Sequence, residues 1–263
     1  MRALQEWPEQ DRRQVVGVFT DIDDTLTTEG AITPDALAAL ACLKQAGLPV
    51  VAITGRPLGW SVPFAQTWPV DAVVAENGSV ALVPRPEGLR KFYLQDAATR
   101  ARNFARMQQV AMRVMREVPG ALVSQDSPGR ETDIAIDHSE FTHLPKAAIA
   151  EVVRVMQSEG MSATVSSIHI NGWYGAHNKL EGARWIAREL LARDLDAEIE
   201  RWVYVGDSTN DELMFEAFPQ SVGVANIRRF EAALIHKPRY ITLGERGAGF
   251  AEVAAALLAA RQL

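Results

Sequence analysis

Cysteine is nearly absent from the chain, and so are long apolar runs. The single cysteine among 263 residues excludes an internal disulfide and suits a reducing compartment. Because Cys42 lies in an apolar, helix-like stretch, 36–43, we expect it to be a small core residue. No segment has the apolar length needed to cross a bilayer, and residues 1–13 are too polar for a signal peptide. We therefore predict a soluble, cytoplasmic protein that has no membrane partner.

Charge of one sign is not concentrated in the sequence either. The net charge is only -6, and the Lys and Arg residues are dispersed, which argues against a nucleic-acid surface. No G-x-G-x-x-G follows the first predicted strand and no Ser-centred nucleophile elbow occurs, which argues against a dehydrogenase and an α/β-hydrolase. What the chain does have is globular composition, with 48% hydrophobic and 23% charged residues.

Strand and helix patterns alternate at the start of the chain. Short apolar runs at 15–20, 49–53 and 72–75 are typical of buried parallel strands, and a helix begins at Pro34 with Thr33 as its N-cap. The same alternation resumes after residue 178, with strands at 202–205, 221–224 and 240–242 and helices at 178–192, from 210, near 229–235 and from 250. We therefore predict an α/β fold with a doubly wound, Rossmann-like, mostly parallel sheet.

The alternation of strands and helices stops between these two stretches. A helix at 98–117, strands at 121–124 and 133–137, a helix at 145–159 and a strand or strand pair at 162–170 come in a different order. We expect residues 1–83 and 171–263 to form a catalytic core, and residues 84–170 to form an inserted α+β cap domain.

Acidic residues mark the end of the first predicted strand. Asp21 and Asp23 come directly after the run at 15–20. Ligands of open α/β sheets bind outside the carboxyl ends of the strands, so carboxylates placed there can hold a metal ion. A solvated acidic turn is the other explanation of this pair when it is considered alone.

A later strand end repeats the arrangement. Asp207 follows the strand at 202–205, and Asp211 lies one helical turn beyond it. A capping box of Thr209 and Glu212 would account for part of this segment, because negative charge suits the first turn of a helix. Capping gives no reason for an acid at the strand end itself, so a metal site remains the stronger hypothesis.

Two further segments offer donors and cations for an oxyanion. Thr54, Gly55 and Arg56 follow the strand at 49–53, where a hydroxyl and a backbone amide can converge on an anion. Thr54 can also cap a helix, and the two roles are compatible. Lys179 begins a helix, where a cation is unfavourable by roughly a few tenths of a kcal/mol. A nearby phosphate or carboxylate would explain it, and an exposed lysine without a role is the alternative.

Taken in order, these four segments resemble the four motifs of the haloacid dehalogenase-like (HAD) phosphohydrolases, over roughly 15–83 and 171–249. The insert resembles the α/β cap of subfamily IIB, which contains sucrose-phosphate, mannosyl-phosphoglycerate and trehalose-phosphate phosphatases and phosphomannomutases. The resemblance implies a Mg²⁺-dependent phosphatase that works through an aspartyl-phosphate.

The resemblance also implies a role for each acid. Asp21 is the nucleophile, and Asp23 is the general acid and then the base, with its backbone carbonyl on the metal. Asp21, Asp23, Asp207 and Asp211 form the metal site, which offers the oxygen ligands that Mg²⁺ prefers. Asp211 and Asn210 orient water, metal ligands or phosphate from outside the metal's direct contacts.

Phosphate and substrate binding follow from the same resemblance. Thr54, the Gly55 amide and Lys179 hold the phosphoryl oxygens, with Arg56 beside them. Candidates for binding the rest of the substrate are polar residues of the insert, namely Arg130, Asp133, Asp137, His138, His169, Asn171 and Trp173. His169 and Asn171 are the best of these, because alternate positions of a strand face the same side. The alternative is that these side chains satisfy one another at a domain hinge.

A phosphorylated sugar or glycoside is the expected substrate. Its hydroxyl-rich leaving group needs several fixed hydrogen-bond donors and acceptors, and the polar residues of the insert could provide them. A phosphomutase would use the same Asp21 and Asp23 but return the phosphoryl group to another hydroxyl. A non-catalytic binding module is the remote alternative, since none of the motif acids is missing.

Overall fold

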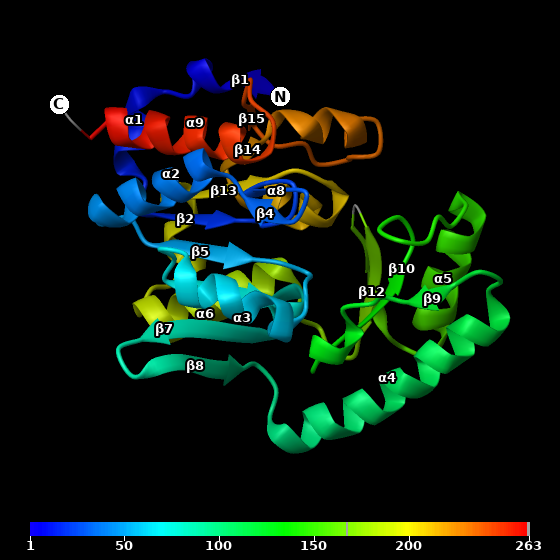
Figure 1. Cartoon of the computed structure of the whole chain (residues 1–263). Helices are drawn as coiled ribbons and strands as arrows, with labels where there is room; N and C mark the ends of the chain where they lie inside the picture. The colour runs from blue at the N-terminus through cyan, green and yellow to red at the C-terminus, as the bar shows by residue number, and fades with distance from the viewer. Residues whose placement is uncertain (167, 262–263) are drawn as a thin grey trace.

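The computed structural model describes residues 1–166 and 168–261. A large sheet with helices on both faces forms the bigger part of the molecule, and a small sheet with two helices lies beside it (Figure 1). Two separate apolar clusters cover the two faces of the large sheet. A third cluster lies under the helices of the small sheet.

The large sheet has the order β1-β15-β14-β13-β2-β5-β6-β7-β8. Its strands are β1 (Arg2–Ala3), β2 (Gly17–Thr20), β5 (Val50–Ile53), β6 (Ala72–Ala75), β7 (Val80–Arg85), β8 (Gly88–Tyr93), β13 (Trp202–Gly206), β14 (Gln220–Gly223) and β15 (Tyr240–Ile241). Pairing is parallel from β1 to β6 and antiparallel from β6 to β8. The predicted fold class, a mostly parallel α/β sheet, is therefore confirmed. Strands β2 and β13 lie side by side in its middle.

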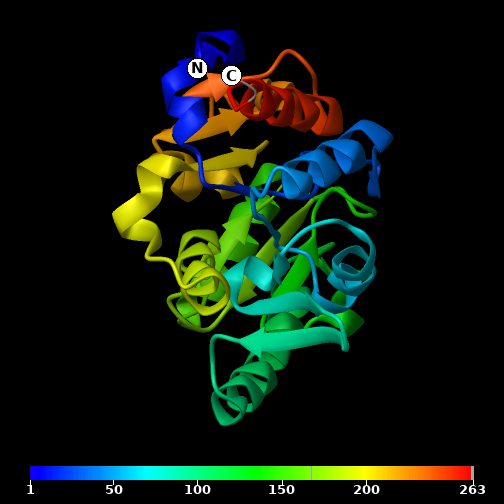
Figure 2. The ribbon, with the colours of Figure 1, turned by 90° about the vertical axis from the view of Figure 1, so that its left-hand side faces the viewer.

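Helices cover both faces because each has one apolar stripe. They are α1 (Glu9–Gln14), α2 (Pro34–Gln45), α3 (Leu58–Thr67), α6 (Lys179–Leu191), α7 (Leu195–Glu198), α8 (Glu212–Ala217) and α9 (Arg246–Ala259). Helices α2, α3 and α9 pack on one face, and α6, α7 and α8 on the other. Helix α1 lies against α9 at the edge where β1 pairs with β15 (Figure 2).

Helix α2 begins at Pro34, after Thr33 in the N-cap position, as predicted. Cys42 is exposed, so the expectation of a buried core cysteine is wrong. The buried stripe of α2 runs through Leu40 and Leu43, and position 42 falls outside it.

The small sheet has the order β11-β12-β10-β9 and is antiparallel throughout. Its elements are α4 (Ala97–Glu117), β9 (Leu122–Val123), β10 (Ile134–Asp137), α5 (Lys146–Ser158), β11 (Ser162–Val165) and β12 (His169–Trp173). Helices α4 and α5 pack on one of its faces, and the other face looks toward the large sheet (Figure 1). The predicted strand pair at 162–170 is present, and residue 167 within it lies outside the described residues.

Some elements differ from the sequence prediction. The hairpin strand β8, placed in the insert by sequence, pairs with β7 in the large sheet, and β12 spans the predicted boundary at 170. The division into core and cap domains stays a prediction. In place of a helix at 229–235 there is a 3₁₀ turn at Ala225–Phe230, and α9 begins at Arg246 rather than near 250.

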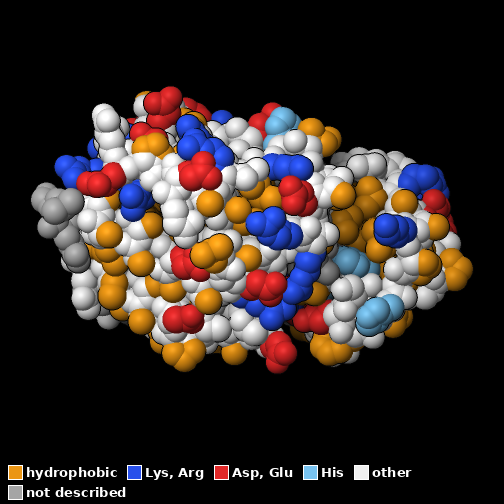
Figure 3. All heavy atoms as spheres, turned by 90° about the horizontal axis from the view of Figure 1, so that it is seen from above, with side chains coloured by type: hydrophobic (Ala, Val, Ile, Leu, Met, Phe, Trp, Pro, Cys, Tyr) orange, Lys and Arg blue, Asp and Glu red, His pale blue; other side chains and the backbone are white. Residues whose placement is uncertain are grey.

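A short antiparallel ribbon, β3 (Thr27–Thr28) with β4 (Ala31–Ile32), follows the first strand end. Viewed from above, Lys and Arg side chains alternate with Asp and Glu over the surface (Figure 3). Among the described helices, none combines the length and the apolar character that spanning a membrane requires.

Candidate active site

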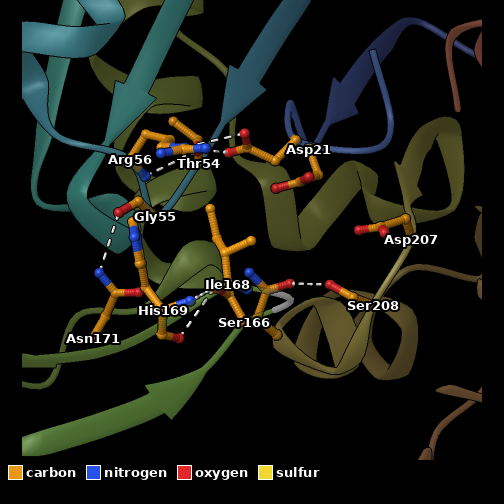
Figure 4. Close-up of a pocket in the computed structure, with 12 residues that line it drawn as sticks. Asp21, Thr54, Gly55, Arg56, Ser166, Ile168, His169, Asn171, Asp207 and Ser208 are labelled. Carbon is orange, nitrogen blue, oxygen red and sulfur yellow. Dashed lines mark hydrogen bonds and ion pairs between the residues drawn. The ribbon is translucent and has the colours of Figure 1, made fainter. Parts of the chain in front are cut away.

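Three buried carboxylates meet where β2 and β13 end. The backbone N–H of Asp21 donates to the carbonyl of Val205 at 2.9 Å, so the two strand ends are held together. Ligand oxygens of Asp21, Asp207 and Asp211 all lie within 4.8 Å of one another. In Figure 4 the side chain of Asp207 points toward that of Asp21. The structure thus brings together acids that the sequence separates by more than 180 residues, and their oxygens are a donor set that suits Mg²⁺.

Like charges at this point need a cation. Burial raises the pKa of Asp21 to about 8, and the charges of Asp211 and Asp23 add to the rise against the opposing effect of Lys179. Burial, with Asp21 and Asp211 as neighbours, also raises the pKa of Asp207 well above its usual value. A bound divalent cation would reverse these shifts, because it favours the charged carboxylates.

Lys179 supplies one positive charge at the site. Its Nζ lies 2.6 Å from an oxygen of Asp21 and 2.6 Å from one of Asp211, and the side chain is 3% exposed. Burial by itself lowers the pKa of Lys179, but the two carboxylates more than offset this and raise it. The alternative of an exposed lysine without a role is wrong. The preceding Asn178 caps α6, because its Oδ1 accepts a hydrogen bond from the Glu181 N–H at 2.9 Å.

Asp211 has both of its oxygens occupied within the protein. Its Oδ1 accepts from the Tyr204 hydroxyl as well as from Lys179. Its Oδ2 accepts from the backbone N–H groups of Asp207 at 2.9 Å and Ser208 at 3.2 Å. Asp211 therefore orients the loop that carries Asp207 and shares the charge of Lys179.

The capping box in this segment is shifted by one residue from the prediction. Ser208 and Asp211 form it, instead of Thr209 and Glu212. The shift requires Gly206, because a Cβ there would lie 2.5 Å from Asp211 Oδ2. Asp211 is thus a capping residue and a site residue at once.

Thr54 and Gly55 line the same pocket from the end of β5. The Thr54 hydroxyl accepts a hydrogen bond from the Arg56 N–H at 3.0 Å. Helix α3 begins at Leu58 after Pro57 in the N-cap position, so Thr54 is not the cap residue of that helix. The hydroxyl and the loop amides remain near the acids, as an oxyanion site requires (Figure 4).

Arg56 connects the site to the small sheet's domain. Its Nε lies 3.1 Å from both oxygens of Asp23, and its Nη1 lies 3.1 Å from Glu140 and 3.5 Å from Asp126. The guanidinium also lies over the ring of Trp60. Burial raises the pKa of Asp23, and Arg56 works against that rise. Arg56 thus holds Asp23, the candidate general acid, in place. The same guanidinium also pairs with Asp126 and Glu140, which lie in loops next to the small sheet.

His169 and Asn171 lie on the face of β12 that looks toward the core. His169 Nε2 is 2.8 Å from Glu140, and burial lowers the pKa of this imidazole. Asn171 Nδ2 donates to the carbonyl of Gly55 at 3.3 Å and to Asp133 at 3.2 Å. Both residues line the pocket across from Asp21 (Figure 4). The expectation that 169 and 171 face one side is confirmed.

The other candidates from the insert make hydrogen bonds within the protein. Arg130 donates to Asp133 at 2.7 Å and to the carbonyl of Gly55 at 3.0 Å, and burial raises the pKa of Asp133 to about 7. Asp137 accepts from the backbone N–H groups of 139–142, His138 bonds the carbonyl of Ser166, and Trp173 donates to the carbonyl of His177. The alternative that these side chains satisfy one another fits Arg130 and Asp133, whereas Asp137, His138 and Trp173 bond backbone groups.

Sequence reasoning missed several residues around the site. The pocket, of about 320 Å³ including its open mouth, is lined by Asp21, Asp23, Thr54, Gly55, Arg56, Ser166, Ile168, His169, Asn171, Asp207, Ser208 and Asn210. Ser166, Ile168 and Ser208 in this set were not singled out, nor were Tyr204, Asp126 and Glu140 behind it. A tyrosine inside an otherwise apolar strand was the one visible signal for Tyr204.

A buried glutamate was also missed. Glu76, in the turn after β6, accepts hydrogen bonds from the backbone N–H groups of Leu58 at 2.9 Å, Glu131 at 3.0 Å and Thr132 at 2.5 Å. It therefore joins the core to the segment before β10. Together with Arg56 and Arg130, it joins segments of the large and the small sheet beside the pocket.

Comparison with known proteins gives a similarity to one family. A profile of haloacid dehalogenase-like hydrolases matches residues 18–128. A phosphoglycolate phosphatase of Haloarcula marismortui is 26% identical over 241 residues, which cover 90% of this chain and 95% of the relative. A solved structure from Thermoplasma acidophilum has a TM-score of 0.71 at 15% identity, covering 93% of this chain and 98% of that chain. The sucrose-phosphatase of Synechocystis, solved with sucrose and phosphate, has a TM-score of 0.67 at 17% identity, with 93% and 98% covered.

The profile match includes the first two motifs, Asp21 to Thr25 and Thr54 to Arg56. The solved structures share the fold over nearly their whole length. With four motifs in order and their acids in one pocket, the chain is similar to the haloacid dehalogenase-like hydrolases, and the relatives it resembles over most of its length include phosphatases.

Proposed function

We propose that the protein is a Mg²⁺-dependent phosphatase that hydrolyses a phosphate monoester through an aspartyl-phosphate at Asp21. The observation that carries the proposal is the meeting of Asp21, Asp207 and Lys179 at the carboxyl ends of β2 and β13. It provides a nucleophile, metal-binding oxygens and a fixed cation around one space, which is what phosphoryl transfer needs.

Asp21 and Asp207 are the side chains that would hold the metal, with the backbone carbonyl of Asp23. When bound, Mg²⁺ would neutralise charge on the phosphoryl oxygens. Asp211 would act on the metal indirectly, because Lys179, Tyr204 and two backbone N–H groups occupy its oxygens.

The chain's own residues account for the covalent steps. A carboxylate oxygen of Asp21 attacks phosphorus while the bond from phosphorus to the leaving oxygen breaks, and Asp23 gives its proton to that oxygen. Asp23 then takes a proton from water as the water attacks the aspartyl-phosphate, which frees Asp21 and releases inorganic phosphate. Lys179, Thr54 and the Gly55 amide stabilise the charge on the other phosphoryl oxygens.

Arg56 supports the role of Asp23. Its two 3.1 Å contacts fix the carboxylate in one orientation, and its contacts with Asp126 and Glu140 tie that orientation to closure of the cap. A closed cap excludes water until the leaving group has its proton.

A neutral, hydroxyl-rich leaving group, such as a sugar or glycoside, fits the pocket best. The cap side offers Asn171, Ser166 and His169, while Asp126 and Glu140 stand behind Arg56 and occupy its positive charge. A carboxylate on the leaving group would have to approach these two acids. Phosphoglycolate, named for the archaeal relative, carries such a carboxylate and is the second candidate.

Phosphate release from a panel of sugar phosphates, phosphoglycolate and nucleotides, with Mg²⁺ and with a chelator, tests the proposal. We expect Mg²⁺-dependent release, fastest with a sugar phosphate. Preference for nucleotides would contradict the substrate class, and isomerised sugar phosphate without released phosphate would identify a mutase.

A further inference from the structure

Asn226 lies at the centre of a hydrogen-bond network beside the carboxylates. It follows β14, as Asp207 follows β13, and its side chain is buried. Its Nδ2 donates to Asp207 Oδ2 at 3.0 Å and to the carbonyl of Asp24 at 3.0 Å. Its Oδ1 accepts from the backbone N–H of Arg246 at 2.9 Å. One amide therefore joins three loops that meet at the site.

The loops on either side of Asn226 are held in unusual backbone conformations. Asp24 and Arg246 each have φ of 54°, in the left-handed region that side chains other than glycine rarely adopt. Such conformations are strained, and they persist where the surroundings fix them. Here Asn226 bonds the backbone of both residues, and Arg246 Nε lies 2.9 Å from Asp24 Oδ1. The hydrogen bonds of Asn226 thus connect Asp207 to both of these strained residues.

The chemistry of an amide suits this position. Asp207 shares the pocket with Asp21 and Asp211, so a lysine or arginine bonded to it would compete with a metal for its charge. A neutral N–H donor orients one oxygen of the carboxylate and leaves its charge available. By contrast, Lys179 bonds Asp211 and one oxygen of Asp21 directly.

We propose that Asn226 is a positioning residue that presents the Asp207 carboxylate to Mg²⁺. This inference depends on the metal site of the proposed function. Asn226 itself would touch neither the metal nor the substrate. Partners that orient a metal ligand in this way typically contribute about tenfold to hundredfold in metal affinity.

The test is calorimetric titration of the whole protein with MgCl₂. We expect Asn226→Ala to raise the Mg²⁺ dissociation constant about tenfold or more. Thr242→Val is the matched control, because Thr242 is buried in the neighbouring loop and donates to the Gly244 carbonyl at 2.7 Å. That variant should bind Mg²⁺ as the parent does. If Asn226→Ala does not fold, Asn226→Ser takes its place, since its shorter side chain cannot reach Asp207.

A second measurement separates positioning from loss of fold. Excess Mg²⁺ should restore phosphate release in Asn226→Ala, whereas it should not restore release in Lys179→Ala. A dissociation constant within about threefold of the parent, or an equal loss in Thr242→Val, would overturn the role of Asn226. A parent protein that binds no Mg²⁺ while releasing phosphate would overturn the role and the metal of the proposed function together. Failure of the parent to release phosphate from any substrate, with Mg²⁺ affinities as expected, would count against the phosphatase alone.

Discussion

At the scale of single residues, Lys179 is the cation that pairs with the buried carboxylates of the site. It neutralises part of two buried carboxylates and would face the transferring phosphoryl group. We predict that Lys179→Ala lowers steady-state phosphate release by about a hundredfold to a thousandfold, because the loss of one such donor typically has this effect. Lys237→Ala is the control, since Lys237 is exposed and pairs only at 3.4 Å with Glu231. Unchanged turnover in a folded Lys179→Ala variant would remove this residue from the site.

The two acids of the first motif have separable predictions. Asp21→Asn should abolish labelling by a ³²P-labelled substrate, because an amide oxygen does not attack phosphorus. Asp23→Asn should still label slowly, since the nucleophile remains but the proton donor and base are lost. Acid-quenched phosphoenzyme on a gel measures both. Labelling of Asp21→Asn would show that Asp21 is not the nucleophile. Rapid turnover by Asp23→Asn would show that Asp23 is not the general acid and base.

Most residues in the motifs could be predicted because each follows a strand whose apolar run is visible in the sequence. Asp21, Thr54 and Asp207 are of this kind, whereas Lys179 was predicted from its place at the start of a helix, where a cation is unfavourable. Asn226 also follows a strand, but an asparagine before a predicted helix is an ordinary cap, so nothing marked it. Glu140 lies in a loop far from any motif. Its contact with Arg56 depends on how the segment of the small sheet packs against the large sheet.

At the scale of elements, the buried parallel strands and the longer helices were predicted within a few residues. The exceptions are elements whose existence depends on distant partners. Strand β1 has two residues, and it pairs with β15 from the far end of the sequence. Strand β8 is largely exposed and carries Lys and Arg side chains, so its sequence resembles a loop. Neither has the apolar pattern on which strand prediction depends.

The connection from β12 to α6 contains a buried histidine with a pH-dependent consequence. Burial lowers the pKa of His177 to about 4, and its ring stacks on Trp173. The unfolded chain takes up this proton near pH 6.5, so the unfolded state binds more protons between about pH 6.5 and 4. The contribution of His177 to the free energy of unfolding is therefore fully present above about pH 6.5. It falls toward pH 4, by up to about 1.4 kcal/mol per pH unit.

His177→Phe keeps an aromatic ring against Trp173 and does not titrate. We predict that the free energy of unfolding falls less steeply on the acid side in this variant than in the parent. Urea unfolding at several values between about pH 4.5 and 7.5 measures the difference. His143→Gln, at an exposed position, should follow the parent. Parallel acid slopes for His177→Phe and the parent would show that the imidazole is not held neutral in the fold.

At the scale of the whole molecule, polar contacts join the small sheet and its loops to the large sheet. Glu76 and Arg56 reach from the core to the cap, and Arg130 reaches back to the carbonyl of Gly55. These partners lie tens of residues apart in the sequence, and Glu76 there looks like an ordinary surface charge. Arg56 and Arg130 were predicted as binding residues, but the contacts between the two sheets that they make could not be predicted.

In the proposed function, the contacts of Arg56 with the small sheet's loops would also affect which leaving groups the pocket accepts. Asp126 and Glu140 use the charge of Arg56, so a substrate carboxylate would enter a region already rich in negative charge. We predict that Glu140→Gln raises kcat/KM for phosphoglycolate relative to the best sugar phosphate by about tenfold, which corresponds to roughly 1.4 kcal/mol of removed repulsion. Asp126→Asn should act in the same direction. Glu189→Gln on the exposed side of α6 should leave the ratio unchanged. A parent enzyme that already prefers phosphoglycolate, with no change of ratio in Glu140→Gln, would mean that Arg56 leaves its cap partners to bind the substrate carboxylate.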